Sequence, residues 1–127
     1  MIKNYTSSVS VERSLELIER ELVRAGAKHV ARSYDDDRHV CGMLFQLEVD
    51  GNPQTFKVPA NVQNVFALMW REVRKPRPST KLLIAEQAAR TAWKLLYDWV
   101  AVQVSLIKVG QAEPMEVFLP YLYDGKR

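Results

Sequence analysis

The chain has 127 residues, of which 47% are hydrophobic and 26% are charged, so it has the composition and the length of a globular domain with its own hydrophobic core. Its single cysteine excludes an intramolecular disulfide and a cysteine-rich zinc site. A net charge of +3 indicates nucleic-acid binding only where the positive residues are clustered.

The length of the chain predicts one domain, residues 1–127, and the pattern of its apolar residues predicts a cytoplasmic protein. The chain does not begin with a basic stretch followed by an apolar run, so we expect no signal peptide. Its longest apolar stretch, Trp93–Val109, is interrupted by Lys94, Asp98 and Lys108 and is therefore not expected to span or bind a membrane.

The first quarter of the chain predicts a strand and a helix. Residues Met1–Ser8 are expected to form a short first strand. A helix is predicted between Ser10, which is a good N-cap, and Gly26, which is typical of the position after a helix end. Its apolar positions share one face: Val11, Leu15, Ile18, Leu22 and Ala25.

The next segment predicts a three-stranded antiparallel meander with one exposed face. Lys28–Tyr34 is rich in strand-forming residues, and Val40–Val49 alternates between apolar and polar positions. The turn sequence Asp50-Gly51-Asn52-Pro53 precedes a returning strand at Thr55–Val58.

Two helices are predicted in the second half. The first has a stripe expected to be buried: Val62, Val65, Phe66, Met69 and Val73. Prolines 76 and 78 predict that the segment Arg71–Lys81 is an extended linker. The long helix Ile84–Val109 follows without Gly or Pro, and it carries a predicted apolar stripe: Ala88, Ala92, Leu95, Trp99, Val102 and Leu106. Further apolar residues are predicted to widen this stripe: Trp93, Leu96, Val100, Ile107 and Val109.

The order of elements is β-α-β-β-β-α-α, followed by the apolar segment Pro114–Tyr123, which we expect to dock on the body. This order predicts an α+β fold: a small antiparallel sheet with helices on one face and one long central C-terminal helix. Because the long helix is apolar almost all round, we expect it to be covered by the sheet or by a second copy in a homodimer.

No catalytic constellation is found, so we expect a protein that is not an enzyme and has no cofactor or metal. Asp35, Asp36 and Asp37 with His39 are the one candidate metal or general-base cluster, but neighbouring acids on a turn point in different directions. A solvated turn is therefore favoured, and a small metal-dependent hydrolase or nuclease is the weakest alternative. Cys41 has no histidine placed to activate it.

A cluster of positive residues gives the best functional lead. From residue 71 to residue 81 five cations accompany one acid, a net charge of +4, which leaves the rest of the chain close to neutral. The predicted partner-binding residues are these cations and the neighbouring tryptophan: Arg71, Arg74, Lys75, Arg77, Lys81 and Trp70. Arg90 and Lys94 extend the cluster if they face the same way. A solvated linker is the alternative interpretation.

Several phrases of the sequence resemble a pattern in small phage and prophage proteins that have no established activity. They are Phe45-Gln46-Leu47-Glu48, Phe56-Lys57-Val58-Pro59-Ala60-Asn61-Val62, Glu86-Gln87-Ala88-Ala89-Arg90-Thr91-Ala92-Trp93-Lys94, Asp98-Trp99, Gln103 and Phe118-Leu119-Pro120-Tyr121. The resemblance covers most of the chain and implies a phage or prophage gene acting in the cytoplasm of a bacterial host.

Together these features predict an accessory protein that binds a protein or nucleoprotein partner in the host and inhibits a host or defence complex by occupying its surface. The alternative is a nucleic-acid-binding accessory protein that uses the basic loop 71–81, because arginines on a proline-stiffened loop also suit phosphates. Salt dependence of binding distinguishes the two functions.

Overall fold

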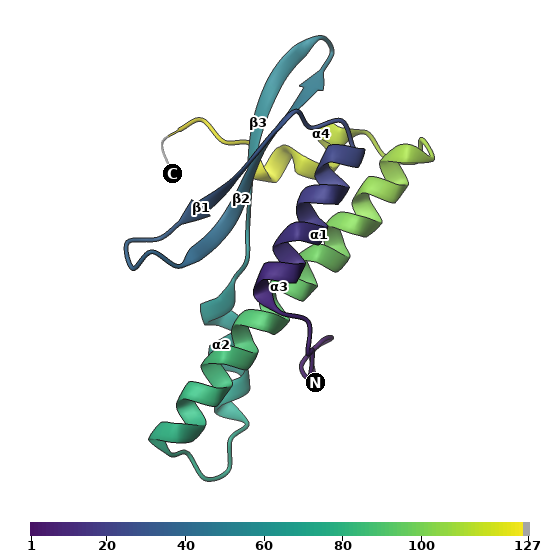
Figure 1. Ribbon diagram of the computed structural model, residues 1–127. Coiled ribbons are helices and arrows are strands. Elements are labelled where there is room, and N and C mark those ends of the chain that lie inside the picture. The colour runs from purple at the N-terminus through teal and green to yellow at the C-terminus, as the bar shows by residue number, and fades with distance from the viewer. Residues whose placement is uncertain (126–127) are drawn as a thin grey trace.

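The computed structural model describes residues 1–125 and has an α+β architecture, as the sequence predicts. A three-stranded antiparallel sheet packs on one face against helices, among them one long helix that extends well beyond the sheet (Figure 1). In chain order the elements are α1 (Val11–Arg24), β1 (His29–Tyr34), β2 (Val40–Val49), β3 (Asn52–Pro59), α2 (Val62–Arg71), α3 (Pro78–Lys108), α4 (Pro114–Phe118) and the 3₁₀ turn η1 (Leu119–Tyr121).

The predicted first strand at Met1–Ser8 is wrong. This segment contains a turn, with Asn4 at a φ of 66°, and it lies against α3 instead of a sheet. Thr91 Oγ1 donates to the Asn4 carbonyl at 2.8 Å, and Gln87 Nε2 donates to the Ser7 carbonyl at 3.0 Å. The backbone carbonyls that a strand would pair are thus bonded by side chains of a helix.

The predicted meander is confirmed, with the strand order β1-β2-β3 and antiparallel pairing throughout. Phe45 at the centre of β2 lies opposite Val30 of β1 and Phe56 of β3. Asp50 and Gly51 connect β2 to β3 with φ angles of 52° and 82°. Two successive positive φ angles are typical of a tight two-residue hairpin turn, for which Asp-Gly is a preferred sequence.

Helix α1 forms where it is predicted, and both its ends have the expected chemistry. Ser10 Oγ accepts a hydrogen bond from the Arg13 amide at 3.0 Å, so it caps the first turn. Gly26 follows the helix with a φ of 108°, which is costly for a residue with a Cβ atom. The helix buries Leu15, Ile18 and Leu22.

Helix α3 begins at Pro78, ahead of the predicted start at Ile84. Proline is tolerated in the first turn because an amide there has no intrahelical partner. The extended linker is correspondingly shorter than the predicted Arg71–Lys81, since α2 reaches Arg71 and Lys81 lies in the first turns of α3.

The single apolar stripe predicted along α3 is only partly correct. Ala88 and Ala92 are buried, but Val102, which continues the same face, is 56% exposed. In the second half of the helix the fully buried residues are Val100, which the sequence predicts only to widen the stripe, and Val104, which it does not predict. At about 100° per residue these two lie on nearly the opposite face of α3 from Val102.

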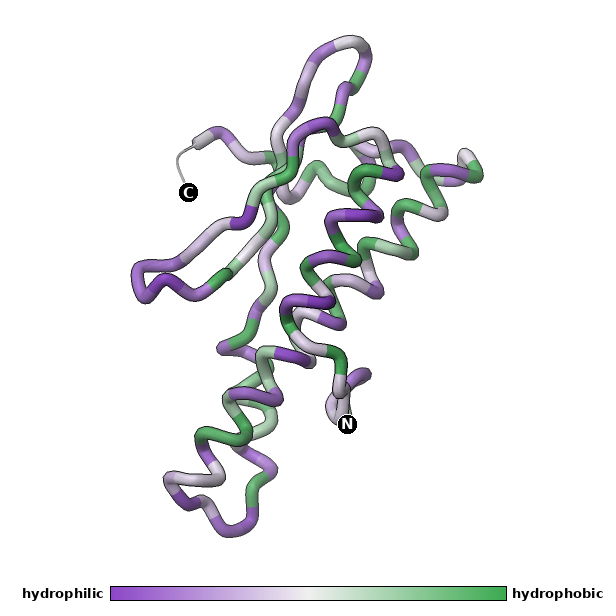
Figure 2. Tube along the Cα trace, in the orientation of Figure 1, coloured by the Kyte–Doolittle hydropathy of each residue, from purple (hydrophilic) through white to green (hydrophobic). Residues whose placement is uncertain are grey.

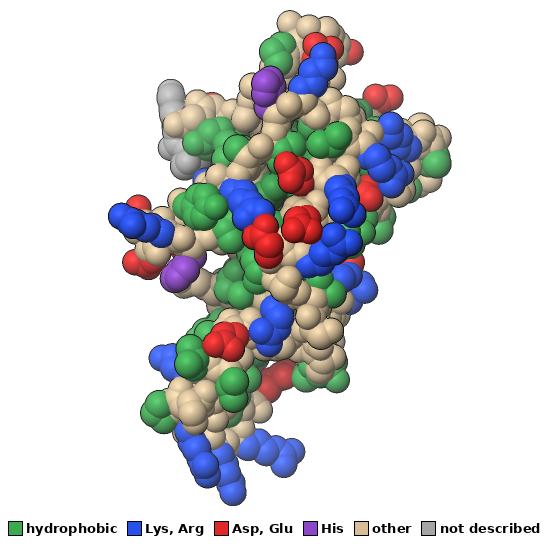
Figure 3. Space-filling model, in the orientation of Figure 1, with side chains coloured by type: hydrophobic (Ala, Val, Ile, Leu, Met, Phe, Trp, Pro, Cys, Tyr) green, Lys and Arg blue, Asp and Glu red, His purple; other side chains and the backbone are tan. Residues whose placement is uncertain are grey.

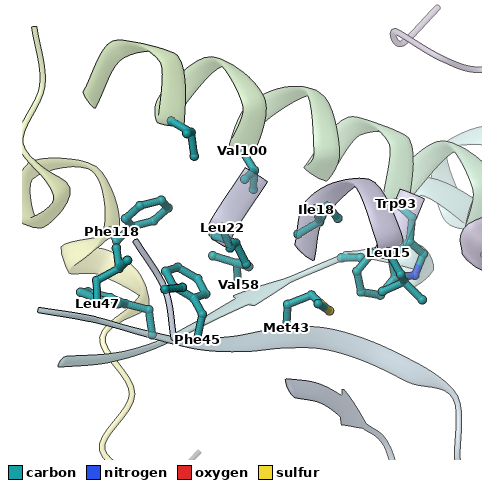
Figure 4. Packing of buried hydrophobic residues seen from close by; sticks show 14 of the residues in the cluster. Leu15, Ile18, Leu22, Met43, Phe45, Leu47, Val58, Trp93, Val100 and Phe118 are labelled. Carbon is teal, nitrogen blue, oxygen red and sulfur yellow. The ribbon is translucent and has the colours of Figure 1, made fainter. Parts of the chain in front are cut away.

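The hydrophobic core lies between the sheet, α1 and the second half of α3, and the C-terminal segment closes one end of it (Figure 4). Phe118 of α4 is fully buried and makes edge contacts with Phe45 and Trp99 at centroid distances of 5.1 and 5.9 Å. Trp93 is 1% exposed. The expectation that the C-terminal segment docks on the body is confirmed.

Replacing Phe118 with alanine is expected to lower the free energy of unfolding by about 3–5 kcal/mol, because the substitution leaves a cavity between the rings of Phe45, Phe56 and Trp99. The neighbouring Leu119, which is 55% exposed, provides the control. Its replacement with alanine should change stability by no more than about 0.5 kcal/mol in urea-induced unfolding. Equal effects of the two substitutions would contradict this packing.

Candidate functional site

The clearest candidate site is a helical hairpin that projects from the body (Figure 1). We call residues 61–87 the hairpin arm; it comprises α2, the loop 72–77 and the first turns of α3. No residue of the arm is fully buried, whereas the body buries residues from β2, β3 and α1. Hydrophobic residues nevertheless occur along both helices of the arm (Figure 2).

The prediction that the apolar stripe of α2 is buried is therefore only partly correct. Its apolar residues Val62, Val65, Phe66 and Met69 are only half-buried, because α2 packs chiefly against α3. One neighbouring helix covers one side of α2 and leaves the flanks of its apolar face accessible. Leu82 and Leu83, in the adjoining turns of α3, are 63% and 65% exposed. The arm thus offers apolar surface that the chain itself does not cover.

The five predicted cations lie together at the far end of the arm, which we call the basic tip: Arg71, Arg74, Lys75, Arg77 and Lys81. Positive side chains gather at this end of the molecule (Figure 3). All five are exposed, and none forms a salt bridge or a side-chain hydrogen bond with any residue in the range 1–125. Their charge is therefore available to a partner.

Arg90 and Lys94 do not extend the basic tip. Arg90 donates to Gln87 Oε1 at 2.7 Å, and Lys94 donates to Asp98 Oδ1 at 2.5 Å. Both side chains are half-buried and already bonded within the chain. The cluster of free cations at the end of the arm is therefore limited to the five residues of the basic tip.

Trp70 lies beside the basic tip but does not stand free in solvent. It is half-buried, and its ring stacks on Phe66 one turn earlier in α2, with the centroids 6.0 Å apart and the planes inclined by 14°. Trp93 belongs to the hydrophobic core, and Trp99 packs against it. Trp70 is thus part of the arm surface, and partly buried tryptophans are of the kind that anchor protein interfaces.

An apolar groove of about 250 Å³ runs along the arm, and sequence reasoning missed it. Met1, Ile2 and Tyr5 of the N-terminal segment form one wall, and residues of α2 and α3 form the other, including Leu68 and Ile84. The only sequence signal was the presence of apolar residues in an otherwise polar N-terminal segment. The groove exists because this segment folds back on α3.

Asp98 of α3 anchors the N-terminal segment. Its carboxylate accepts a hydrogen bond from Asn4 Nδ2 at 2.8 Å and lies 3.2 Å from Lys3 Nζ. Burial raises the pKa of Asp98, but the hydrogen bonds from Lys94, Asn4 and Lys3 together outweigh burial and hold that pKa below its ordinary value. The charged form is therefore the one that holds the wall of the groove in place.

The substitution Asp98→Asn should lower stability by about 1–3 kcal/mol at neutral pH, because it removes the charge that several donors share. A lowered folded-state pKa means that the carboxylate stabilises the fold above the unfolded-state pKa. The advantage of the native protein over D98N should therefore shrink as the pH falls below about 4 in denaturant unfolding. A difference independent of pH would contradict this assignment.

The structure brings together three of the four residues of the predicted acidic turn. Ligand atoms of Asp35, Asp37 and His39 lie within 4.8 Å of one another, and all three residues are exposed. However, Asp35 Oδ1 already accepts hydrogen bonds from the Asp37 and His39 amides, each at 2.9 Å. The arrangement closes the turn between β1 and β2, as the solvated-turn interpretation predicts.

Asp35→Ala is expected to cost about 0.5–1.5 kcal/mol of stability, because two backbone amides lose their acceptor. Asp36→Ala, one residue along the same turn, should be close to neutral. Millimolar magnesium or calcium should leave the thermal midpoint of the native protein unchanged, since a metal bound to the folded state would raise it. A metal-dependent rise that D35A abolishes would make this turn a metal site.

The other histidine and the single cysteine, His29 and Cys41, are not brought together. His29 is exposed at the start of β1, and Cys41 is half-buried with its Sγ 3.9 Å from Ser33 Oγ. The aromatic residues of the C-terminal segment contact the body: Tyr121 packs on Trp99 with their ring centroids 5.6 Å apart.

No helix within residues 1–125 is both long and apolar enough to cross a bilayer.

Comparison of the chain with known proteins finds no match: no family model, no curated protein and no solved structure is significantly similar to it.

Proposed function

We propose that this chain is a small non-enzymatic accessory protein whose hairpin arm binds an acidic and partly apolar surface of another protein. The resemblance to small phage and prophage proteins supports a phage or prophage origin and a partner in the bacterial host. On this proposal, the protein acts in the host cytoplasm and inhibits a host or defence complex by occupying its surface.

The observation that carries the proposal is the incomplete burial of the arm. A globular chain normally covers the apolar faces of its helices, because leaving them in water forgoes about 25 cal/mol per Å². Here the whole segment 61–87 lacks a fully buried residue, although it presents Phe66, Met69, Leu82 and Leu83. A partner that covers the arm would recover this energy on binding.

The combination of exposed leucines with cations favours a protein over a nucleic acid. Phosphates are contacted by cations and other donors, and Leu82 and Leu83 offer them nothing. An aromatic platform for unpaired bases needs a free ring face, and stacking on Phe66 takes up one of the two faces of the half-buried Trp70. Acidic side chains around an apolar pocket would match both the charge and the hydrophobicity of the arm.

The non-enzymatic part of the proposal rests on how the perturbed titratable groups are used. Glu12 and Asp98 have lowered pKa values because Arg32 and the Lys94–Asn4–Lys3 donors, respectively, hydrogen-bond their carboxylates. Both carboxylates hold parts of the fold together, α1 to β1 and the N-terminal segment to α3. Neither lies in the groove along the arm.

Neutralising the basic tip with Arg74→Gln, Lys75→Gln and Arg77→Gln should weaken partner binding about tenfold, because each lost charge contributes about 0.2–1 kcal/mol. A photo-crosslinking residue in place of Leu83 captures the partner from lysate of the bacterial host, and the yield of the crosslinked species is measured. The matched control neutralises Arg13, Arg20 and Lys108, which are exposed cations outside the arm.

The nucleic-acid alternative is tested with the same variants. Labelled single-stranded DNA, duplex DNA and RNA are titrated at about 50 mM and 200 mM salt, a range over which phosphate binders lose affinity steeply. The proposal predicts no salt-sensitive binding that depends on the basic tip. Binding that falls with salt and is lost in the tip variant, but kept in the control variant, would make nucleic acid the target and overturn the proposal.

A further inference from the structure

One edge of the sheet is covered by the C-terminal segment, and the other edge is open within residues 1–125. The outer edge of β3 is covered, because Leu122 forms a bridge with Phe56 and the Tyr123 amide donates to the Thr55 carbonyl at 2.9 Å. The outer edge of β1 has no strand beside it within residues 1–125. An open edge presents unpaired amides and carbonyls, which are a template for another strand.

The register identifies which residues of β1 carry these free groups. The backbone carbonyl of Thr55 points away from β2 and accepts from Tyr123, so the backbone amide and carbonyl of Phe56 point toward β2. The amide and carbonyl of one residue point to the same side of an antiparallel strand, and the side alternates along it. When this alternation is followed across the paired strands, the backbone amide and carbonyl of Ala31 point toward β2. Those of Val30 and Arg32 point toward the free edge of β1.

The charges at the two ends of β1 are of opposite sign. Lys28 precedes the strand, and the acidic turn Asp35–Asp37 follows it, with all of these residues exposed. When two such strands pair antiparallel about a twofold axis, the N-terminal end of each strand lies beside the C-terminal end of the other. The edge is therefore complementary in charge to a copy of itself.

We propose that two copies of this chain pair through antiparallel β1 strands and form one continuous sheet from their two three-stranded sheets. In the register centred on Arg32, Lys28, just ahead of β1 in each copy, lies at the same end of the paired strands as the turn Asp35–Asp37 of the other copy, with Asp36 as its nearest counterpart by register. Val30 lies opposite Tyr34, whose side chain is 58% exposed in the single chain and gains a neighbour on the same face. Pairs directly opposite each other on one face are the contacts that stabilise antiparallel pairing.

Two Arg32 side chains meet at the twofold axis of this register, and each is already neutralised. Its guanidinium donates to both carboxylate oxygens of Glu12 on α1, with the Nη1–Oε2 distance 2.9 Å. This hydrogen bond lowers the pKa of Glu12, so the pair stays charged near neutral pH. The axis therefore carries two ion pairs and no net charge, and like-charge repulsion does not oppose the register.

This dimer is independent of the proposed binding function. It uses residues 28–36, whereas the hairpin arm spans residues 61–87, and the two surfaces share no residue. The sequence suggests a homodimer in which a second copy covers the long helix. The second half of α3 instead packs on α1 and the sheet of its own chain, so the proposed dimer uses the edge of β1 and not α3. Failure of one proposal leaves the other standing.

The test is a charge exchange between copies, with the molar mass of the full chain measured by size-exclusion chromatography and light scattering over a dilution series. The native protein is expected to be a dimer. Lys28→Glu alone and Asp36→Lys alone should each weaken dimerisation about tenfold or more, because both symmetric contacts become repulsive. Arg20→Glu, an exposed charge reversal on α1, is the control and should leave the dimer intact.

Mixing the two single variants should restore the dimer. In the mixed pair the introduced glutamate of one variant faces the introduced lysine of the other, and the native Asp36 of the first faces the native Lys28 of the second. Within one chain these two positions flank a strand that rises about 3.3 Å per residue, so they cannot restore each other directly.

Three results would overturn the proposal. The first is a native protein that stays monomeric at every concentration, and the second is a pair of single variants that dimerise like the native protein. A mixture of the two variants that remains monomeric is the third.

Discussion

Helix α3 buries different faces along its length, and the positions of the other elements follow from this change. As far as Ala92 the buried residues are Ala88, Thr91 and Ala92, whereas from Trp93 onward Trp93, Val100 and Val104 are buried on a face rotated by about 140°. The second half faces α1 and the sheet, and the first turns extend beyond them as one strut of the hairpin arm. One continuous helix therefore supports both a core and a projection.

This division separates the energetics of the core from those of the arm. Trp93, Phe45, Phe56 and Phe118 are fully buried in the body and supply much of the apolar burial that stabilises the fold. The arm has half-buried apolar residues, exposed leucines and unpaired cations. Segments with little burial open locally at a small cost in free energy, and such segments are commonly the ones used in binding. Surface that the core does not need is then available to a partner.

The sequence predicts most of the fold because its signals are local. Alternation identifies β2, Ser10 and Gly26 mark the ends of α1, and the density of Arg and Lys identifies the basic tip. The long-range features escape prediction: nothing local to Asn4 indicates that Thr91 and Asp98 bond its backbone and side chain. The change of buried face along α3 escapes for the same reason, since apolar residues occur on several faces and only tertiary packing selects between them.

The central claim is that the arm is energetically separate from the core, and native-state hydrogen exchange tests it most directly. We expect the amides of residues 93–104 of α3 to exchange only through global unfolding, and those of α2 and residues 82–87 to exchange through local opening at a clearly lower free energy. Both sets of amides belong to well-formed helices, and residues 82–87 lie in the same helix as residues 93–104. A difference in helix content therefore does not explain a difference in exchange. Equal protection of the two halves of α3 would contradict the account.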